Sequence, residues 1–468
     1  MNNTNISQFG LSRRELLHKT HLGLGSIALH SLLARNASQA SELPEKTSHA
    51  ATAKNVILLT MSGGPSQIDL FDPKPEVNRL DGKPLPEGVN EKFALIRGTP
   101  LLMGSPYQFS QHGESGAVFS NLLPKMAGIA DELTVVRSLS TESFNHDPAM
   151  TMFNTGSTRP GRPCMGSWLS YGLGSENKDL PAFVVLISGD GQPLGAHAWS
   201  SGFLPTSHQG VRFRSARDPV LFLKDPEWMS RSSRRRSLDA LTRLNRLEED
   251  RTGDSEIDTR IQAYEMAFRM QTAVPNLVNL SQETAATHKL YGSEPGQPSF
   301  AANCLMARRM VEDGVRFVQL YHRGWDHHTI LPKQLPGQCF DVDQPSAALI
   351  TDLKQRGLLE DTMIVFAGEF GRTVFCQGKL ERTDYGRDHH PRCFSMFMAG
   401  GGIKPGMTYG ETDEFSYNIV RDPVHIRDLN ATILHCLGID HKKLTFKFQG
   451  RDYRLTDVHG NVAQPLLS

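Results

Sequence analysis

The chain has 468 residues, with 50 basic and 50 acidic side chains, so its formal net charge is zero. This length is enough for one large α/β domain with insertions or for two domains, and either would bury a substantial core. A neutral balance argues against a nucleic-acid-binding role that relies on a basic surface, and it leaves electrostatic binding to local patches. We therefore expect no nucleic-acid partner.

The first forty residues have the composition of an export signal. Arg13 and Arg14 precede a modestly apolar segment, residues 22–34, which ends near the small-residue sequence 37–40. This order, with paired arginines, resembles a twin-arginine signal; the alternative is a chance arginine pair ahead of a short helix. We predict a signal peptide at 1–40, a linker at 41–54, and delivery by the twin-arginine export machinery to the periplasm or the extracellular space. No later run reaches the ~18 apolar residues of a membrane span, so we expect no stable membrane span.

The six cysteines are widely scattered along the chain, with no close Cys-x-x-Cys pair. This spacing argues against a zinc knuckle and against a thioredoxin-like motif. An even number outside the cytoplasm permits disulfides without requiring any.

Short apolar runs with the character of buried strands recur from Asn55 onward. The first, residues 56–61, is stopped by a Ser-Gly-Gly-Pro loop, the pattern of a strand that is buried on both faces. Helix-patterned stretches lie between several runs, so we predict an α/β fold in which helices flank a mostly parallel central sheet. The other runs are at 133–136, 183–187, 316–321, 363–366 and 394–398, and the helical stretches include 299–312 and 343–356.

A charged, helix-patterned segment at about residues 225–290 has few strand-like runs. It contains the arginine-rich run 231–237, followed at helical spacing by leucines at 238, 241, 244 and 247, the pattern of an amphipathic helix. A solvated helix end explains these arginines better than a phosphate-binding patch does. We predict a helical insertion within one domain that spans residues 55–462, followed by a tail at 463–468.

Three loops that follow predicted strands are rich in metal-ligating side chains. In an open parallel sheet, functional loops lie at the carboxyl ends of the strands. Imidazole together with carboxylate suits Zn, Mn, Fe or Ni, whereas Mg or Ca prefers oxygen alone. We therefore predict a divalent transition-metal site; the alternatives are a hydrogen-bonded surface loop and, for Glu369 with Arg372, a plain salt bridge. The loops are 322–328 (His-Arg-Gly-Trp-Asp-His-His), 368–373 (Gly-Glu-Phe-Gly-Arg-Thr) and 385–391 (Tyr-Gly-Arg-Asp-His-His-Pro).

A second candidate site lies at residues 143–156. Pro148 and the terminal Gly156 predict a short helix whose amino terminus lies beside Asn145, His146 and Asp147. Free N–H groups at such an end bind anions such as phosphate or sulfate. The alternative is that Asp147 is only the N-cap of this helix.

Together these motifs resemble the alkaline phosphatase superfamily, and more closely a large sulfatase-like bacterial family known only as a domain of unknown function. The resemblance covers about residues 55–462, and its motifs are specific as a set. It implies the alkaline phosphatase and sulfatase fold. The motifs are 61–69 (Met-Ser-Gly-Gly-Pro-Ser-Gln-Ile-Asp), 145–148 (Asn-His-Asp-Pro), 324–328 (Gly-Trp-Asp-His-His), 368–373 and 386–390 (Gly-Arg-Asp-His-His).

The resemblance also implies which residues bind metal. One metal site would contain Asp326 and His328, with His389 or His390, and Asp388 is a further retained ligand candidate. In the wider superfamily two metal ions together stabilise an in-line displacement.

The chain departs from that superfamily at the second metal and at the nucleophile. Glu369 falls where the second site usually has an aspartate, and Phe370 replaces a His or Asn ligand. The first strand ends in Ser62-Gly63 where an aspartate is expected, which leaves Asp69 as a distant substitute. His146 stands where a Cys, Ser or Thr nucleophile is expected, so the usual nucleophile is missing.

Two functions are consistent with this pattern. In the first, the protein is an exported metal-dependent hydrolase of sulfate or phosphate esters, with His146 or Glu369 as an acid/base group or extra ligand and Arg372 or Arg387 binding the anionic group. In the second, it is a non-catalytic envelope protein that binds an anionic glycan or a protein partner. Phosphorylation of His146 is a third route. Retained ligands favour the first function, and the missing nucleophile favours altered or absent ester hydrolysis.

Overall fold

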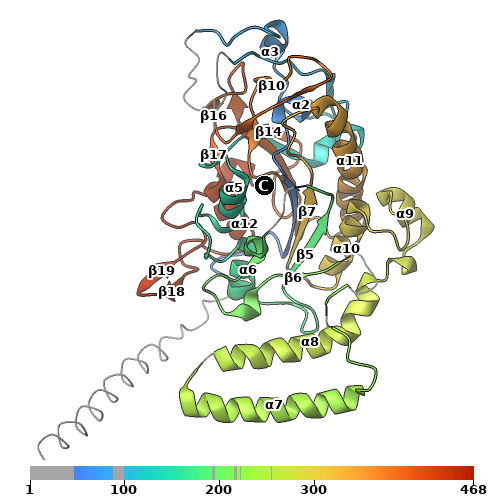
Figure 1. Ribbon diagram of the computed structural model, residues 1–468, viewed down its shortest axis with the longest axis vertical. Coiled ribbons are helices and arrows are strands. Elements are labelled where there is room, and N and C mark those ends of the chain that lie inside the picture. Colours follow the sequence, from blue (N-terminus) through green and yellow to red (C-terminus); the bar gives the residue numbers. More distant parts are fainter. Residues whose placement is uncertain (1–46, 88–99, 192–194, 215–218, 222, 255) are drawn as a thin grey trace, which may run out of the picture.

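A computed structural model describes residues 47–87, 100–191, 195–214, 219–221, 223–254 and 256–468. The predicted signal peptide and the first part of the predicted linker lie outside these described residues. Figure 1 shows a central sheet with helices on both sides and, at the bottom of the view, two long helices that protrude from the body. No helix in the described ranges is long and apolar enough to cross a membrane.

The centre of the fold is a nine-stranded sheet in the order β14-β4-β13-β8-β1-β7-β5-β6, with β17 beside β4. Strand β1 (Asn55–Ser62) pairs in parallel with β7 (Phe317–Arg323) and with β8 (Thr362–Ala367). Among the described pairings in this sheet, only those of β13 (Phe394–Ala399), with β4 and β8, are antiparallel. The prediction of a mostly parallel sheet is confirmed.

Each of the six apolar runs predicted as a strand forms one. The runs are continuously hydrophobic because the strands are buried on both faces. In β1, Ile57 and Leu59 contact one hydrophobic core, and Val56 and Leu58 contact the other. The remaining strands of the sheet are β4 (Thr134–Ser140), β5 (Phe183–Ser188), β6 (Val211–Arg212), β14 (Met407–Tyr409) and β17 (Val424–His425).

Helices cover both faces of the sheet. On one side lie α10 (Phe300–Glu312) and α11 (Leu331–Gln355), and on the other lie α6 (Met165–Leu173) and α12 (Ile426–Cys436) (Figure 1). The helix predicted at 343–356 begins earlier, at Leu331, because α11 accommodates two internal prolines. Such prolines normally end a helix, and they hide the first half of α11 from the sequence pattern.

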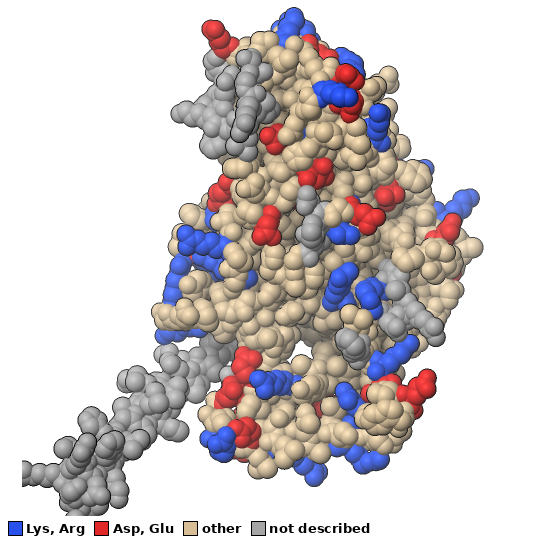
Figure 2. Space-filling view, viewed as in Figure 1, with Lys and Arg blue, Asp and Glu red and all other residues tan. Residues whose placement is uncertain are grey.

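The predicted insertion is helical. Helix α7 (Arg231–Thr252) pairs with α8 (Glu256–Val278) in the protruding hairpin, and α9 (Ala285–Tyr291) follows. Ser230 caps α7 through its side chain, so the arginine run does open a helix. The leucine stripe is only partly covered: Leu238 is buried, whereas positions 241, 244 and 247 are exposed. Basic and acidic side chains are interspersed over the hairpin in Figure 2, as expected of a solvated surface.

The smaller elements connect these layers. All six cysteines are free thiols. The short helices are α2 (Gln67–Leu70), α3 (Pro75–Arg79), α4 (Pro124–Ala127), η1 (Ala130–Glu132), η2 (Ala196–Trp199), η3 (Thr206–His208), η4 (Leu280–Gln282) and η5 (Gln464–Leu466); the small sheets contain β2 (Phe109–His112), β3 (Ala117–Ser120), β9 (Gly371–Arg372), β10 (Gln377–Gly378), β11 (Tyr385–Gly386), β12 (His389–His390), β15 (Glu411–Thr412), β16 (Ile419–Arg421), β18 (Phe446–Phe448) and β19 (Arg451–Tyr453).

Helix α5 (His146–Thr155) forms the short helix predicted at the second candidate site. It begins at His146, with Asn145 as its N-cap, and it ends at Gly156, whose φ of 69° is left-handed. The interpretation of Asp147 as the N-cap is wrong, because Asp147 lies inside the first turn. The end of α5 also contacts the rest of the fold closely, since a Cβ on Gly156 would lie 2.1 Å from the carbonyl oxygen of Leu455.

The end of α5 gives a test of this packing. Gly253 ends α7 with a similar φ of 67°, but a Cβ there would meet nothing within 4 Å. Gly253→Ala is expected to cost about 1 kcal/mol through backbone strain alone, and Gly156→Ala about 3 kcal/mol or more, because strain and steric clash add. Thermal unfolding of both variants measures the difference, and equal shifts in Tm would contradict the close contact.

Candidate metal centre

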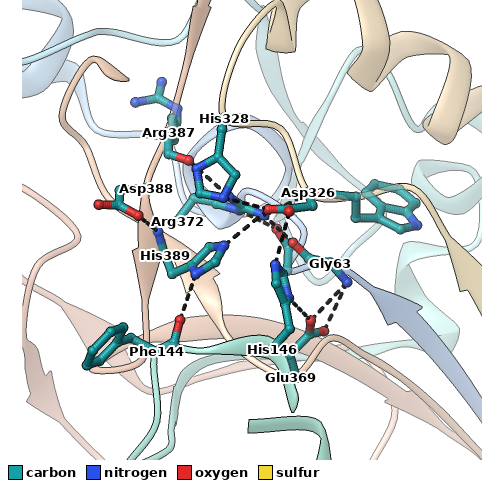
Figure 3. Close-up of polar contacts among 12 residues, drawn as sticks. Gly63, Phe144, His146, Asp326, His328, Glu369, Arg372, Arg387, Asp388 and His389 are labelled. Atoms are coloured by element: carbon teal, nitrogen blue, oxygen red, sulfur yellow. Dashed lines mark hydrogen bonds and ion pairs between the residues drawn. The ribbon is translucent and has the colours of Figure 1, made fainter. Parts of the chain in front are cut away.

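Four side chains converge at the carboxyl edge of the sheet: His146, Asp326, His328 and His389, each of which offers one ligand atom within 4.8 Å of the others. These four residues could hold a metal ion, and we call this candidate site the metal centre. His146 begins α5 after β4, Asp326 and His328 follow β7, and His389 lies on β12, which pairs with β9 just after β8. Because the parallel strands end at one edge, these distant segments meet there (Figure 3).

Asp326 is the shared neighbour of the three imidazoles. Its Oδ2 lies 3.1 Å from Nε2 of His146, and its Oδ1 lies 2.9 Å from Nε2 of His328 and 3.1 Å from Nε2 of His389. The same ring nitrogen of each histidine therefore faces the same carboxylate. The four side chains are half-buried, and His328 is the most open to solvent, with 35% of its side chain exposed.

The other nitrogen of each ring is bonded to an acceptor outside the metal centre. Nδ1 of His146 lies 2.7 Å from Glu369 Oε1, Nδ1 of His328 lies 2.6 Å from Gln377 Oε1, and Nδ1 of His389 lies 2.6 Å from the carbonyl oxygen of Phe144. Carbonyl and carboxylate oxygens accept hydrogen bonds, so each Nδ1 donates its proton outward, and each ring, when neutral, presents the lone pair of Nε2 inward. Outer partners of this kind orient metal-binding histidines in proteins.

Three inward lone pairs around one carboxylate repel it unless a cation lies between them. Nε2 of His146 is buried and has no hydrogen-bond partner of correct geometry among the described residues. Protonation of all three rings would gather three positive charges beside Arg372, which already contacts Asp326. A set of three imidazoles and one carboxylate fits a transition-metal ion by its donor chemistry.

Glu369 acts on the metal centre through His146. Its side chain is fully buried, and both carboxylate oxygens accept the N–H of Gly63, at 3.0 and 3.2 Å. Gly63 has a φ of 122°, and a Cβ there would lie 2.5 Å from the amide nitrogen of Asp326. Glycine is required at this position, where the resemblance expects an aspartate. A backbone donor and an imidazole therefore satisfy Glu369, the residue that the resemblance aligns with an aspartate of the second metal site.

Arg372 is a structural residue, and the prediction that it holds a substrate anion is wrong. Its guanidinium is buried and donates to the carbonyl oxygens of Gly64 and Arg387, both at 2.9 Å, and to that of Gly63. It also donates to Oδ1 of Asp326 at 2.7 Å. All three of its nitrogens are engaged within the protein, so Arg372 positions Asp326 and does not reach an ester.

Arg387 and Asp69 form a second buried pair away from the metal centre. Arg387 donates to the two oxygens of Asp69 at 2.8 and 3.2 Å, and both side chains are fully buried. Asp69 also accepts from the hydroxyl of Ser66 at 2.6 Å. These contacts contradict two predictions, since Asp69 is committed to Arg387 instead of a metal, and the guanidinium of Arg387 points away from His146, Asp326, His328 and His389 (Figure 3).

The neighbours of His389 differ from it in role. His390 lies on the opposite face of β12, buried and stacked on Tyr417, whose carbonyl oxygen lies 2.9 Å from its Nε2. Burial lowers the pKa of His390 to about 4. The carboxylate of Asp388 accepts the backbone N–H of His389 at 2.8 Å. The structure therefore brings His389 into the metal centre, places Asp388 beside it and excludes His390.

The predicted anion-binding residues lie at the start of α5. Asn145 is exposed and makes no side-chain cap hydrogen bond. Asp147 is also exposed, and its carboxylate lies 3.0 Å from Nε2 of His197. Neither side chain belongs to the metal centre.

The sequence did not reveal the groups that bond to the metal centre from outside. Gly63 lies within a recognised motif, but neither Gln377 nor the carbonyl group of Phe144 carries a signal of its own.

The pKa values in the metal centre are shifted by burial and by the short distances between its charged side chains. Burial alone would lower the pKa of His146, but contacts with Asp326 and Glu369 outweigh it and raise this pKa to about 9. Burial opposes the charge of Asp326, yet contacts with the three histidines hold its pKa far below the usual range. Burial lowers the pKa of His389. Without metal, the protonated ring of His146 therefore lies between two carboxylates, with Nε2 facing Asp326 and Nδ1 facing Glu369.

Residues 53–467 match a family model described as "Protein of unknown function (DUF1501)". The match covers most of the chain, so the protein belongs to this family. The predicted membership in a family known only as a domain of unknown function is confirmed. No curated protein matches the chain.

Several solved structures share features of this fold. Ps i-CgsB in complex with k-i-k-neocarrahexaose is 12% identical, with a TM-score of 0.38, over 82% of this chain and 72% of that one. The PsFucS1 sulfatase from Pseudoalteromonas sp. is 12% identical, with a TM-score of 0.38, over 89% and 72%. Alkaline phosphatase from the Antarctic bacterium TAB5 is 11% identical, with a TM-score of 0.35, over 83% and 98%. At these values the likeness assigns no substrate and no residue role to this chain.

The buried pair beside the metal centre gives a stability test. Asp69→Leu or Arg387→Met alone leaves a buried charge without its partner and is expected to cost about 3–5 kcal/mol. The double variant Asp69→Leu/Arg387→Met removes both charges and is expected to cost less than either single change. Urea unfolding measures all three, and additive losses in the double variant would contradict the pairing.

A second test follows from the pKa of His146. The folded value of about 9 lies above the ordinary 6.5, so this contribution to stability is fully present below pH 6.5 and is lost as the pH rises to about 9. Metal-free protein is expected to lose up to about 1.4 kcal/mol per pH unit across this window. His146→Gln should flatten the profile of unfolding free energy against pH, and an unchanged slope would contradict the assignment.

Proposed function

We propose that this protein is a metal-dependent hydrolase of sulfate or phosphate esters, in which His146, Asp326, His328 and His389 hold one divalent ion. One observation carries the proposal: three imidazoles present Nε2 to a single carboxylate while outer acceptors fix each Nδ1. The donor set suits Zn, Mn, Fe or Ni. When bound, such an ion lowers the pKa of a coordinated water and polarises an ester oxygen.

The side chains around the proposed ion have different roles. Glu369 keeps the proton on Nδ1 of His146 and so keeps Nε2 free as a ligand. Arg372 balances the charge of Asp326 and fixes its position. His328, the most exposed ligand, marks the side from which an ester reaches the centre.

The threonine hydroxyls that follow His146 on α5 are engaged within that helix. Thr151 and Thr155 follow on the same helix, but their hydroxyls donate to the carbonyl oxygens of Asp147 and Thr151, at 2.7 and 2.8 Å. His146 itself is engaged at Nδ1 by Glu369 and faces Asp326 through Nε2. These contacts favour a water molecule as the attacking group over a phosphorylated or sulfated side chain.

Metal analysis of the mature protein is the first test. Protein purified without chelator is expected to contain about one equivalent of a transition metal, and Asp326→Ala/His328→Ala is expected to contain none, because removal of two of four ligands abolishes tight binding. The neighbours His389 and His390 provide a test variant and its matched control. His389→Ala should lose metal, whereas His390→Gln should retain it. Folded wild type that takes up no added metal would contradict the proposed hydrolase.

Activity is tested on the same set of proteins. Metal-loaded wild type is expected to hydrolyse 4-nitrophenyl sulfate or 4-nitrophenyl phosphate, and His389→Ala should lower kcat/KM at least ~100-fold while His390→Gln changes it little. Metal binding without turnover of either ester would favour the second function, an envelope protein that binds an anionic glycan or a protein partner.

Export by the twin-arginine machinery to the periplasm or beyond belongs to the same proposal. Its support is the sequence of residues 1–40 alone. The double variant Arg13→Lys/Arg14→Lys is expected to stay unprocessed inside the cell, because this machinery reads the arginine pair. Cell fractionation compares it with wild type, and unchanged export would contradict the twin-arginine signal.

A further inference from the structure

A cavity of about 580 Å³ opens at the carboxyl ends of β5, β6 and β7. None of the four residues of the metal centre lines it. Trp325 is fully buried and connects the two places. Its indole N–H donates to Nδ1 of His322 in the cavity wall, at 3.0 Å, and the next residue in the chain is Asp326.

His322 presents an N–H group to this cavity. Because Trp325 donates to Nδ1, the proton of the neutral ring lies on Nε2. The residue is only 1% exposed, and its Nε2 is 3.6 Å from the nearest carboxylate oxygen, that of Asp341. That separation is too long for a hydrogen bond. A buried donor therefore faces the cavity without a bonded acceptor among the described residues.

The amino terminus of α10 supplies further donors to the same wall. Ser299 caps this 13-residue helix by accepting the N–H of Ala302 at 3.0 Å. Phe300 and Ala301 also line the cavity, and within the described part of the chain their amides have no acceptor. The end of a helix of this length carries a partial positive charge, which favours an anion.

The charged side chains around the cavity point to the same kind of ligand. Arg212 and Arg214 line it against one carboxylate in the described lining, that of Asp341. The described lining therefore offers the cation of Arg212 in addition to the end of the helix. Phe340 stands at the same cavity with 84% of its surface exposed. An exposed ring of this size favours a ligand with an apolar or ring-shaped part.

We infer that this cavity binds an organic anion, with its phosphate, sulfate or carboxylate group held by Arg212, His322 and the first amides of α10, and with its organic part against Phe340. The inference does not depend on hydrolysis at the metal centre. A bound anion would contact His322 directly and so act on the hydrogen bond to Trp325, one residue from a metal ligand. The cavity is thus placed to bind a second group of a substrate or a separate effector.

Calorimetric titration of Asp326→Ala/His328→Ala with phenyl phosphate tests the inference, because this background removes the metal centre as a competing anion site. The probe is expected to bind with a stoichiometry of one. Adding Arg212→Glu should weaken binding at least ~10-fold, since a cation that contacts the anion becomes a second carboxylate. Arg243→Glu, the same charge change on the distant and exposed helix α7, is the control and should leave binding unchanged.

Two further measurements test the contact with Phe340 and the independence of the cavity from the metal centre. Phe340→Ala should weaken phenyl phosphate but not inorganic phosphate if the ring contacts the organic part. Wild type and the double variant should bind the probe at this site alike, which distinguishes the cavity from the metal centre. Absence of binding in the double variant, or equal effects of Arg212→Glu and Arg243→Glu, would overturn the cavity as an anion site. Equal affinity for both probes would overturn the role of Phe340.

Discussion

The buried guanidinium of Arg372 holds the site together. It bonds to backbone carbonyls in the loop after β1 and in the loop that leads to β12, and it pairs with Asp326 after β7. A buried cation is costly unless its donors are satisfied, and each nitrogen of this one is bonded. The consequence is mechanical: the loops that carry Gly63, Asp326 and His389 are fixed relative to one another before any ligand binds.

A second consequence is that the charge of Glu369 is already balanced. The backbone amide of Gly63 and the imidazole of His146 satisfy this carboxylate. Because Gly63 has no side chain, its backbone can lie close to the loop that carries Asp326 while its N–H donates to Glu369. Hydrogen bonds alone therefore satisfy Glu369, and the possible metal ligands gathered beside it are three imidazoles and one carboxylate.

Much of the fold followed from the sequence because strands buried on both faces leave unbroken apolar runs, as in β1 and β8. The site was harder to predict. His389 and His390 are equivalent in sequence, and the two-residue alternation of a short strand alone decides which one faces Asp326. Arg372 and Arg387 looked like substrate ligands because pattern does not report burial. The leucines of α7 predicted an amphipathic helix, but helical periodicity says nothing about whether a partner covers its apolar face.

The hydroxyls of α5 bond to their own helix, and this has a stereochemical consequence for the proposed chemistry. An enzyme that first transfers the phosphoryl or sulfuryl group to its own side chain displaces twice and returns the group with its original configuration. With water attacking directly, there is a single in-line displacement. Hydrolysis of a chiral phosphate ester should therefore release phosphate with inverted configuration at phosphorus. Alcohols should compete poorly with water as acceptors, because there is no covalent intermediate for them to attack.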